Sequence, residues 1–214
     1  IIKTNLNLKN MKNKYYLGLK YLPLRREFDQ YHNLEKEIKK NLKDISIIFG
    51  GSDLNGFTLK LLNIILDNKE FFSNLNINII LGPAFKFHKK FYQLLGKNDL
   101  KINIYEDPNN LIDLLYNADL VISAAGILMY ELAYLGTPAI IIPQVDHQEY
   151  VLKLLEKYNA YISLNRNPTN ERIMKEINKL LNNVNLRKKL STNSKKMIDG
   201  RGLERIVRLI ESLL

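Results

Sequence analysis

The sequence has no cysteine and no tryptophan, and only three histidines among its 214 residues. Without cysteine, the chain can form no disulfide, no thiolate nucleophile and no cysteine-ligated zinc or iron–sulfur site. His32, His88 and His147 lie far apart and lack the spacing of metal ligands. Neither a pair of carboxylates nor a Ser/His/Asp set stands out. We therefore expect no metal, no cofactor and no catalytic residue, which indicates a binding role.

Long apolar runs are also absent. No stretch approaches the roughly 20 apolar residues that cross a bilayer, so we expect no transmembrane segment. No basic-then-apolar leader opens the chain, and we expect a cytoplasmic protein. The sequence starts instead on an apolar stub, residues 1–5, that is typical of the end of a buried strand. We interpret the chain as a fragment whose upstream portion is missing.

Acidic residues are outnumbered, 22 to 32, by lysine and arginine, which gives a formal net charge of +10. A basic surface can serve nucleic acid, anionic lipid or phosphorylated substrates. The basic residues concentrate near both ends of the chain and are not interleaved with aromatics in a nucleic-acid-binding module. We expect no nucleic-acid partner, whereas contact of the basic ends with a membrane stays open.

From residue 34 onward, short apolar runs alternate with stretches of helical spacing. We predict strands at 45–49, 78–81, 102–105, 120–123, 139–143 and 160–162. We predict helices at 34–42, 57–67, 86–95, 108–117, 127–135, 147–157, 168–183, 185–198 and 202–213. Continuous apolar runs are typical of strands covered on both faces, and strand–helix alternation produces parallel pairing. The predicted fold is a Rossmann-like, doubly wound parallel α/β sheet of about six strands with helices on both faces.

Residues 1–33 do not follow this alternation. Pro23 prevents a regular helix around it and favours an extended Leu22. We interpret residues 1–33 as the end of a preceding domain plus a linker, outside the core. Residues 34–214 then form a C-terminal nucleotide-binding domain.

Ligands of such folds bind beyond the carboxyl ends of the strands, so the residues there are candidates for a site. Gly50, Gly51 and Ser52 follow the first predicted strand. Glycine allows close approach of the backbone to a ligand, and free amides at the next helix start attract phosphate. The loop is neither GxGxxG nor a P-loop, and a purely structural turn is the alternative.

A second candidate follows the fourth predicted strand. Ser123, Ala124, Ala125 and Gly126 are small enough to let a diphosphate sit on the following helix start, where amides and macrodipole point at it. Glu131 lies on that helix, and a carboxylate there commonly holds ribose hydroxyls. Close packing beside a surface carboxylate is the alternative interpretation.

The fifth predicted strand is followed by His147 and Gln148. Gln148 is placed to donate to a phosphate or hydroxyl group. His147 has the chemistry of a general base, but a lone loop histidine is more often a surface residue, so we do not predict catalysis there.

Together these residues resemble a known family. Ser123 through Gln148 is similar to the donor-nucleotide motif of GT-B proteins related to the bacterial lipid II N-acetylglucosaminyltransferase. Residues 18–28 (GLKYLPLRREF), 49–58 (FGGSDLNGFT) and 199–207 (DGRGLERIV) extend the resemblance over nearly the whole chain. With them, it is most similar to the UDP-sugar hydrolase of pseudaminic acid biosynthesis and to spore-coat polysaccharide biosynthesis proteins.

The resemblance implies that this chain is the UDP-binding half of a GT-B architecture. By position, Gly50, Gly51 and Ser52 would line the diphosphate and sugar side. Residues 123–126 would form the phosphate-binding helix start, Glu131 would hold the ribose and Gln148 would face the phosphate or sugar. The final helix, around Arg205, would pack towards the missing domain, which carries the catalytic histidine in the family.

Two positions depart from the family pattern. Ile127-Leu128-Met129 is apolar where relatives often have serine or threonine, which leaves backbone amides as the phosphate contacts. Asp146-His147-Gln148 replaces a common Asn-Gln, so we expect different sugar contacts.

The expected function is therefore binding of UDP or a UDP-sugar within an enzyme of surface-polysaccharide biosynthesis. The leading hypothesis is a hydrolase that releases UDP from a UDP-diacetamido-trideoxy sugar. A GT-B glycosyltransferase and a non-catalytic nucleotide-binding subunit beside a separate partner chain are the alternatives. In each case a missing N-terminal domain completes the site, and we expect this chain alone to be inactive.

Overall fold

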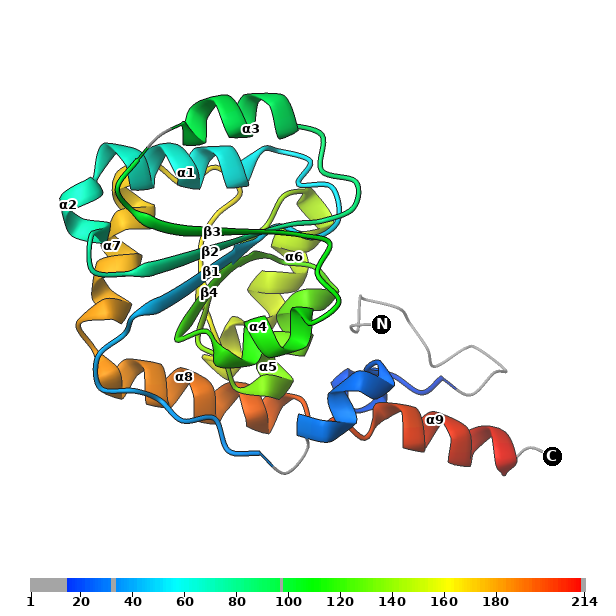
Figure 1. Ribbon diagram of the computed structural model, residues 1–214. Coiled ribbons are helices and arrows are strands. Elements are labelled where there is room, and N and C mark those ends of the chain that lie inside the picture. Colours follow the sequence, from blue (N-terminus) through cyan, green and yellow to red (C-terminus); the bar gives the residue numbers. More distant parts are fainter. Residues whose placement is uncertain (1–14, 32–33, 97, 213–214) are drawn as a thin grey trace.

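The computed structural model describes residues 15–31, 34–96 and 98–212 (Figure 1). The apolar stub of residues 1–5 and His32 therefore lie outside the described residues. The described chain forms a parallel sheet with helices on both faces. Among the described residues, no helix has the length and hydrophobicity of a membrane span.

Six parallel strands build the sheet in the order β3-β2-β1-β4-β5-β6. The strands are β1 (Asp44–Ile48), β2 (Asn76–Leu81), β3 (Lys101–Glu106), β4 (Leu120–Ala124), β5 (Ala139–Ile142) and β6 (Ile162–Ser163). The chain runs outward from β1 to β3 and then returns to the other side of β1, so the order reverses between β1 and β4. This arrangement confirms the predicted Rossmann-like, doubly wound fold.

Helices cover both faces of the sheet. They are α1 (Phe57–Asp67), α2 (Lys69–Phe72), α3 (His88–Leu95), α4 (Leu111–Asn117), α5 (Ile127–Leu135), α6 (Asp146–Leu155), α7 (Asn170–Leu181), α8 (Val184–Met197) and α9 (Gly202–Glu211). Helices α1, α3 and α7 pack on one face, and α4, α5 and α6 pack on the other (Figure 1). α9 extends away from the sheet beside the blue segment that begins at Tyr15.

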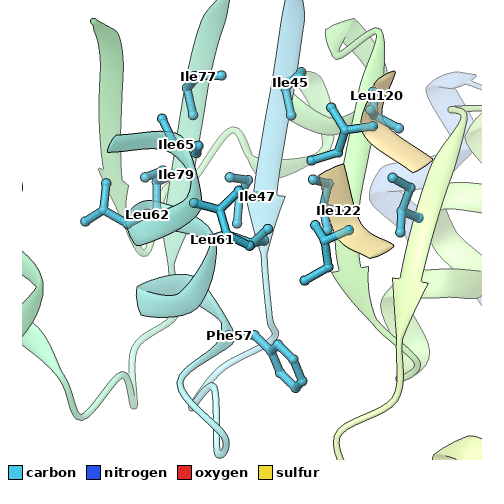
Figure 2. Close-up of a cluster of buried hydrophobic side chains, with 14 of the residues drawn as sticks. Ile45, Ile47, Phe57, Leu61, Leu62, Ile65, Ile77, Ile79, Leu120 and Ile122 are labelled. Atoms are coloured by element: carbon cyan, nitrogen blue, oxygen red, sulfur yellow. The ribbon is translucent and has the colours of Figure 1, made fainter. Parts of the chain in front are cut away.

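Successive side chains of each strand point to opposite faces of the sheet, which divides the core into two layers. In β1, Ile45 and Ile47 belong to the layer under α1, whereas Ile48 belongs to the layer under α5. Figure 2 shows side chains of α1, such as Leu61 and Leu62, packed against those of β1 and β2. Complete burial of each such side chain contributes about 1.5–3 kcal/mol, which explains why the sheet has continuous apolar strands.

The predicted helix at 34–42 is wrong. No helix covers these residues, and their backbone and side chains bind other elements instead. Lys36 donates to the carbonyl of Ala118, just past the end of α4, at 2.8 Å. The carbonyls of Lys39 and Lys40 accept from the buried guanidinium of Arg187 at 2.7 and 2.9 Å. These tertiary contacts outweigh the helical preference of the charged segment. The spacing of residues in the sequence does not reveal such contacts.

The prediction that residues 1–33 lie outside the core is wrong for two aromatic residues. Phe28 and Tyr31, on the 3-10 turn η3 (Arg26–Tyr31), are 1% and 6% exposed and belong to the layer with α5. The ring of Phe28 meets that of Tyr134 edge-on, with centroids 6.0 Å apart. Leu22 is extended as predicted, after the short turn η2 (Leu19–Tyr21). This segment is therefore fixed to the domain.

Pro108 does not begin the fourth helix. α4 starts three residues later, at Leu111. Asp107, with a φ of +42°, lies at the bend that follows β3. The short helix α2 and the 3-10 turn η4 (Glu156–Tyr158) were not predicted. The other elements lie at their predicted positions to within a few residues.

Candidate functional site

The carboxyl ends of β1, β4 and β5 meet at one edge of the sheet, where the strand order reverses. This is the position at which doubly wound folds bind their ligands. The loops that follow these three strands contain Gly50, Gly51, Ser52, Ala125 and Gly126, whereas the other predicted site residues lie at the end of β4 (Ser123, Ala124), on α5 (Glu131) and on α6 (Gln148). The edge is therefore the candidate site.

The loop after β1 is closed by Asp53. Its buried carboxylate accepts from the backbone amides of Phe57 and Thr58, at 2.9 and 2.8 Å, at the start of α1. Burial raises the pKa of Asp53, and these hydrogen bonds oppose the rise. The amides of Phe57 and Thr58 are thus occupied, so the expectation of free amides at this helix start is wrong for these two. Asp53 precedes the helix by four residues, outside the usual capping position, and the sequence did not single it out.

Gly50 and Gly51 are exposed on this loop, and Ser52 is half-buried. Gly50 has a φ of +73°, which favours glycine. The carbonyl of Gly51 accepts from the amide of Ala84 at 2.8 Å. A Cβ on Gly82 would lie 2.5 Å from the Cα of Gly51, so the turns after β1 and β2 touch backbone to backbone. The glycines therefore build a fixed loop at the edge of the site.

The turn after β4 leads into the start of α5, where the surroundings of the first amides differ from those at the start of α1. Gly126 is the N-cap of α5 and, being glycine, has no side chain that could accept from the first amides of the helix. A Cβ on Gly126 would meet no atom within 4 Å, so open space adjoins this helix start. Ala124 and Ala125 are buried beneath the turn. The start of α5 therefore stays the candidate for the predicted anion-binding end.

Ser123 does not lie at the turn itself. It is fully buried within β4, and its hydroxyl has no hydrogen-bond partner among the residues that the structure describes. Its side chain is therefore part of the sheet rather than of the surface that a ligand would touch.

Glu131 lies on the second turn of α5 and is 6% exposed. Its Oε1 accepts from Nε of Arg25 at 3.1 Å, while its Oε2 has no hydrogen-bond partner within residues 15–31, 34–96 and 98–212. Burial raises the pKa of Glu131, Arg25 lowers it, and Glu27 adds a smaller rise. The alternative of an ordinary surface carboxylate does not hold, because this one is buried and paired.

Arg25 was not predicted as a site residue. Its side chain is half-exposed, and its guanidinium lies over the ring of Phe28 at 5.3 Å. The contact with Glu131 joins positions 106 residues apart, which no local pattern reveals. The only sequence signal was the position of Arg25 inside the stretch 18–28 that carried the family resemblance.

Gln144 links two of the loops and was also missed. Its Nε2 donates to the carbonyl of Phe49 at 3.1 Å, and its Oε1 accepts from the amide of Asn55 at 3.3 Å. Oε1 of Gln148 accepts from the amide of Gln144 at 2.7 Å, so this predicted ligand residue holds the loop in place. His147 is exposed on the first turn of α6.

The geometry brings together a helix start with glycine at its N-cap, a buried carboxylate with one unoccupied oxygen and loops fixed to one another. Amides at a helix start bind anions, and a carboxylate accepts from hydroxyl groups. The arrangement suits binding of a molecule that carries both phosphate and hydroxyl groups.

The fold and this edge define the chain as a Rossmann-like half of the GT-B architecture. Residues 45–206 match the family described as "Glycosyltransferase family 28 C-terminal domain", and the chain belongs to that family.

The chain is similar to several named proteins of this kind. An uncharacterised protein of Methanocaldococcus jannaschii is 36% identical over 71% of the chain and 30% of its own length. The spore coat polysaccharide biosynthesis protein SpsG of Bacillus subtilis is 25% identical over 94% of the chain and 59% of its length. The UDP-N-acetylglucosamine–N-acetylmuramyl-(pentapeptide) pyrophosphoryl-undecaprenol N-acetylglucosamine transferase of Finegoldia magna is 28% identical over 89% and 54%.

Among solved structures, MurG of Acinetobacter baumannii superposes with a TM-score of 0.66 at 19% identity. The match covers 84% of this chain and 55% of that one, and it shows the shared fold. The chain spans less than two thirds of the length of each of these proteins. The predicted relation to GT-B proteins and to the spore-coat protein is confirmed, whereas none of these relatives is named as a hydrolase.

Proposed function

We propose that this domain binds the nucleotide of a UDP-sugar at the carboxyl edge of its sheet, as the donor-binding half of a glycosyltransferase. The observation that carries the proposal is the contrast between two neighbouring helix starts. At α1, Asp53 occupies the amides of Phe57 and Thr58, whereas at α5 the N-cap residue Gly126 has no side chain and adjoins open space. A diphosphate placed on α5 is stabilised by the first amides of that helix and by its macrodipole.

In this proposal the ribose lies over the second turn of α5. Oε1 of Glu131 is occupied by Arg25, which leaves Oε2 to accept from the ribose hydroxyls. Gly50, Gly51 and Ser52 line the opposite wall, and Gln148 faces the diphosphate or sugar through the amide nitrogen that the loop does not use. The choice of uridine rests on the similarity to a relative named for its UDP-N-acetylglucosamine substrate.

A titration of the domain with UDP, CDP, ADP and GDP tests the proposal. We expect UDP to bind more tightly than either purine nucleotide. NMR amide shifts should concentrate at residues 126–131 and 50–52 and spare the start of α1. Equal or absent binding of all four nucleotides, or shifts centred on Phe57 and Thr58, would contradict it.

A UDP-sugar hydrolase is the second candidate, and the stretches 18–28, 49–58 and 199–207 are the observation that favours it. In both proposals a second domain, outside the 214 residues of this chain, supplies the acceptor site and the catalytic groups. The domain alone should then bind UDP without turning over a UDP-sugar. Product analysis with the full-length protein separates the two, because a hydrolase releases UDP with no acceptor present.

A further inference from the structure

Two stretches from opposite ends of the sequence lie against each other beside the candidate site. η2 and Leu22 pack on the first turn of α9. A Cβ on Gly202 would collide with the carbonyl group of Leu22, so only glycine allows this approach. Both stretches belong to the motifs that the proposed function leaves without a role.

Arg205 reinforces the contact. Its Nη1 donates to the carbonyl of Lys20 at 2.8 Å, and its two terminal nitrogens donate to both carboxylate oxygens of Asp199 at 2.9 and 2.6 Å. A bidentate pair of this kind fixes the orientation of the guanidinium. Arg205 therefore holds the backbone at Lys20 in a defined place.

The held segment leads directly to the carboxylate of the site. After Leu22, Pro23 restricts the backbone, and the next fixed point is the buried ring of Phe28. Arg25 lies between the contact with α9 and this ring, and its Nε donates to Oε1 of Glu131. The backbone is thus fixed on both sides of Arg25, by α9 before it and by the buried ring of Phe28 after it.

We propose that Gly202 and Arg205 are positioning residues for nucleotide binding. They fix the segment from Lys20 to Arg25 so that Arg25 holds one oxygen of Glu131 and leaves the other for the ribose hydroxyls. This inference rests on the proposed function, in which Glu131 contacts the ribose.

The test compares binding of UDP with binding of 2′,3′-dideoxyuridine diphosphate, which lacks the hydroxyls that Glu131 would bind. The affinity ratio of these two ligands reports on the ribose contact alone, and a merely structural role would not change it. We expect Arg205→Ala and Asp199→Asn to lower the ratio about threefold or more, since a misplaced carboxylate loses part of a charge-assisted hydrogen bond. Inorganic pyrophosphate should bind these variants as it binds the wild type.

Arg208→Ala is the matched control. Arg208 lies on the same helix and is also ion-paired, to Glu204, but it is 72% exposed and has no hydrogen bond to the segment 20–25. Its ratio should equal that of the wild type, and Arg205→Lys should recover part of the loss. Gly202→Ala should lower the ratio as well, but its Cβ would also displace α9 from Leu22, so the Arg205 variants decide the matter.

The outcomes separate the inference from the proposed function. If Glu131→Gln abolishes the preference for UDP while Arg205→Ala and Asp199→Asn keep it, the positioning role is refuted and the ribose contact stands. If the wild type shows no preference, or Glu131→Gln keeps it, the ribose contact itself fails and the positioning role fails with it.

Discussion

Replacement of Asp53 tests how the loop after β1 is held. The carboxylate accepts two backbone amides at the start of α1 and is almost completely buried. Loss of a helix cap costs about 0.5–2 kcal/mol, and a buried amide left without a partner costs about 1–3 kcal/mol. Because the surrounding loop can admit water to one amide, we expect Asp53→Ala to lower the free energy of unfolding by about 2–4 kcal/mol.

For a domain of this size, each kcal/mol shifts the melting temperature by about 2–4 °C, so a decrease of roughly 5–15 °C is expected. Asp53 also has a φ of +43°, which an alanine adopts less readily than glycine. Asp53→Gly should therefore lose less stability than Asp53→Ala, and Asp53→Asn, which keeps one acceptor oxygen, should lose least. Differential scanning calorimetry measures all three. A melting temperature within about 2 °C of the wild type for Asp53→Ala would refute the capping role.

Two further perturbations have defined outcomes. Gly82→Ala should destabilise the domain and weaken UDP binding, because its Cβ would lie 2.5 Å from the Cα of Gly51, whereas Gly51→Ala, which meets no atom within 4 Å, should melt as the wild type does. Arg25→Ala should move the loss of UDP binding on acidification to higher pH. Ionised Glu131 is a stronger acceptor for hydroxyl groups than the protonated acid. Arg25 lowers the pKa of Glu131 against burial and Glu27, so removal of the guanidinium raises that pKa further. A pH profile unchanged from the wild type would contradict this.

The strands and most helices were predictable because their signals are local. α1 and α5 have the predicted bounds, and α5 is bracketed by Gly126 and Gly136, the latter at a φ of +72°. Continuous apolar runs marked β1, β4 and β5 because helices cover both faces of the sheet there. The local sequence pattern was sufficient for elements whose burial follows from their own apolar residues.

The missed features depend on contacts between distant residues. The segment 34–42 has the composition of a charged helix, but Arg187 and α4 bind its backbone and Lys36. Glu131 was predicted from its place on a helix after a strand, whereas its partner Arg25 comes from a segment that looked like a linker. Likewise, nothing in the loop 50–56 showed that Asp53 occupies the amides of α1.

The central claim is that Glu131 binds the ribose of the nucleotide and that the start of α5 binds its diphosphate. Isothermal titration of the wild type and Glu131→Ala with UDP and with inorganic pyrophosphate tests it most directly. Loss of a charge-assisted hydrogen bond costs about 1.5–3 kcal/mol, so UDP should bind the variant at least about tenfold more weakly. Pyrophosphate, which contacts only the helix start, should bind both proteins alike. An unchanged UDP affinity in a correctly folded Glu131→Ala would contradict the claim.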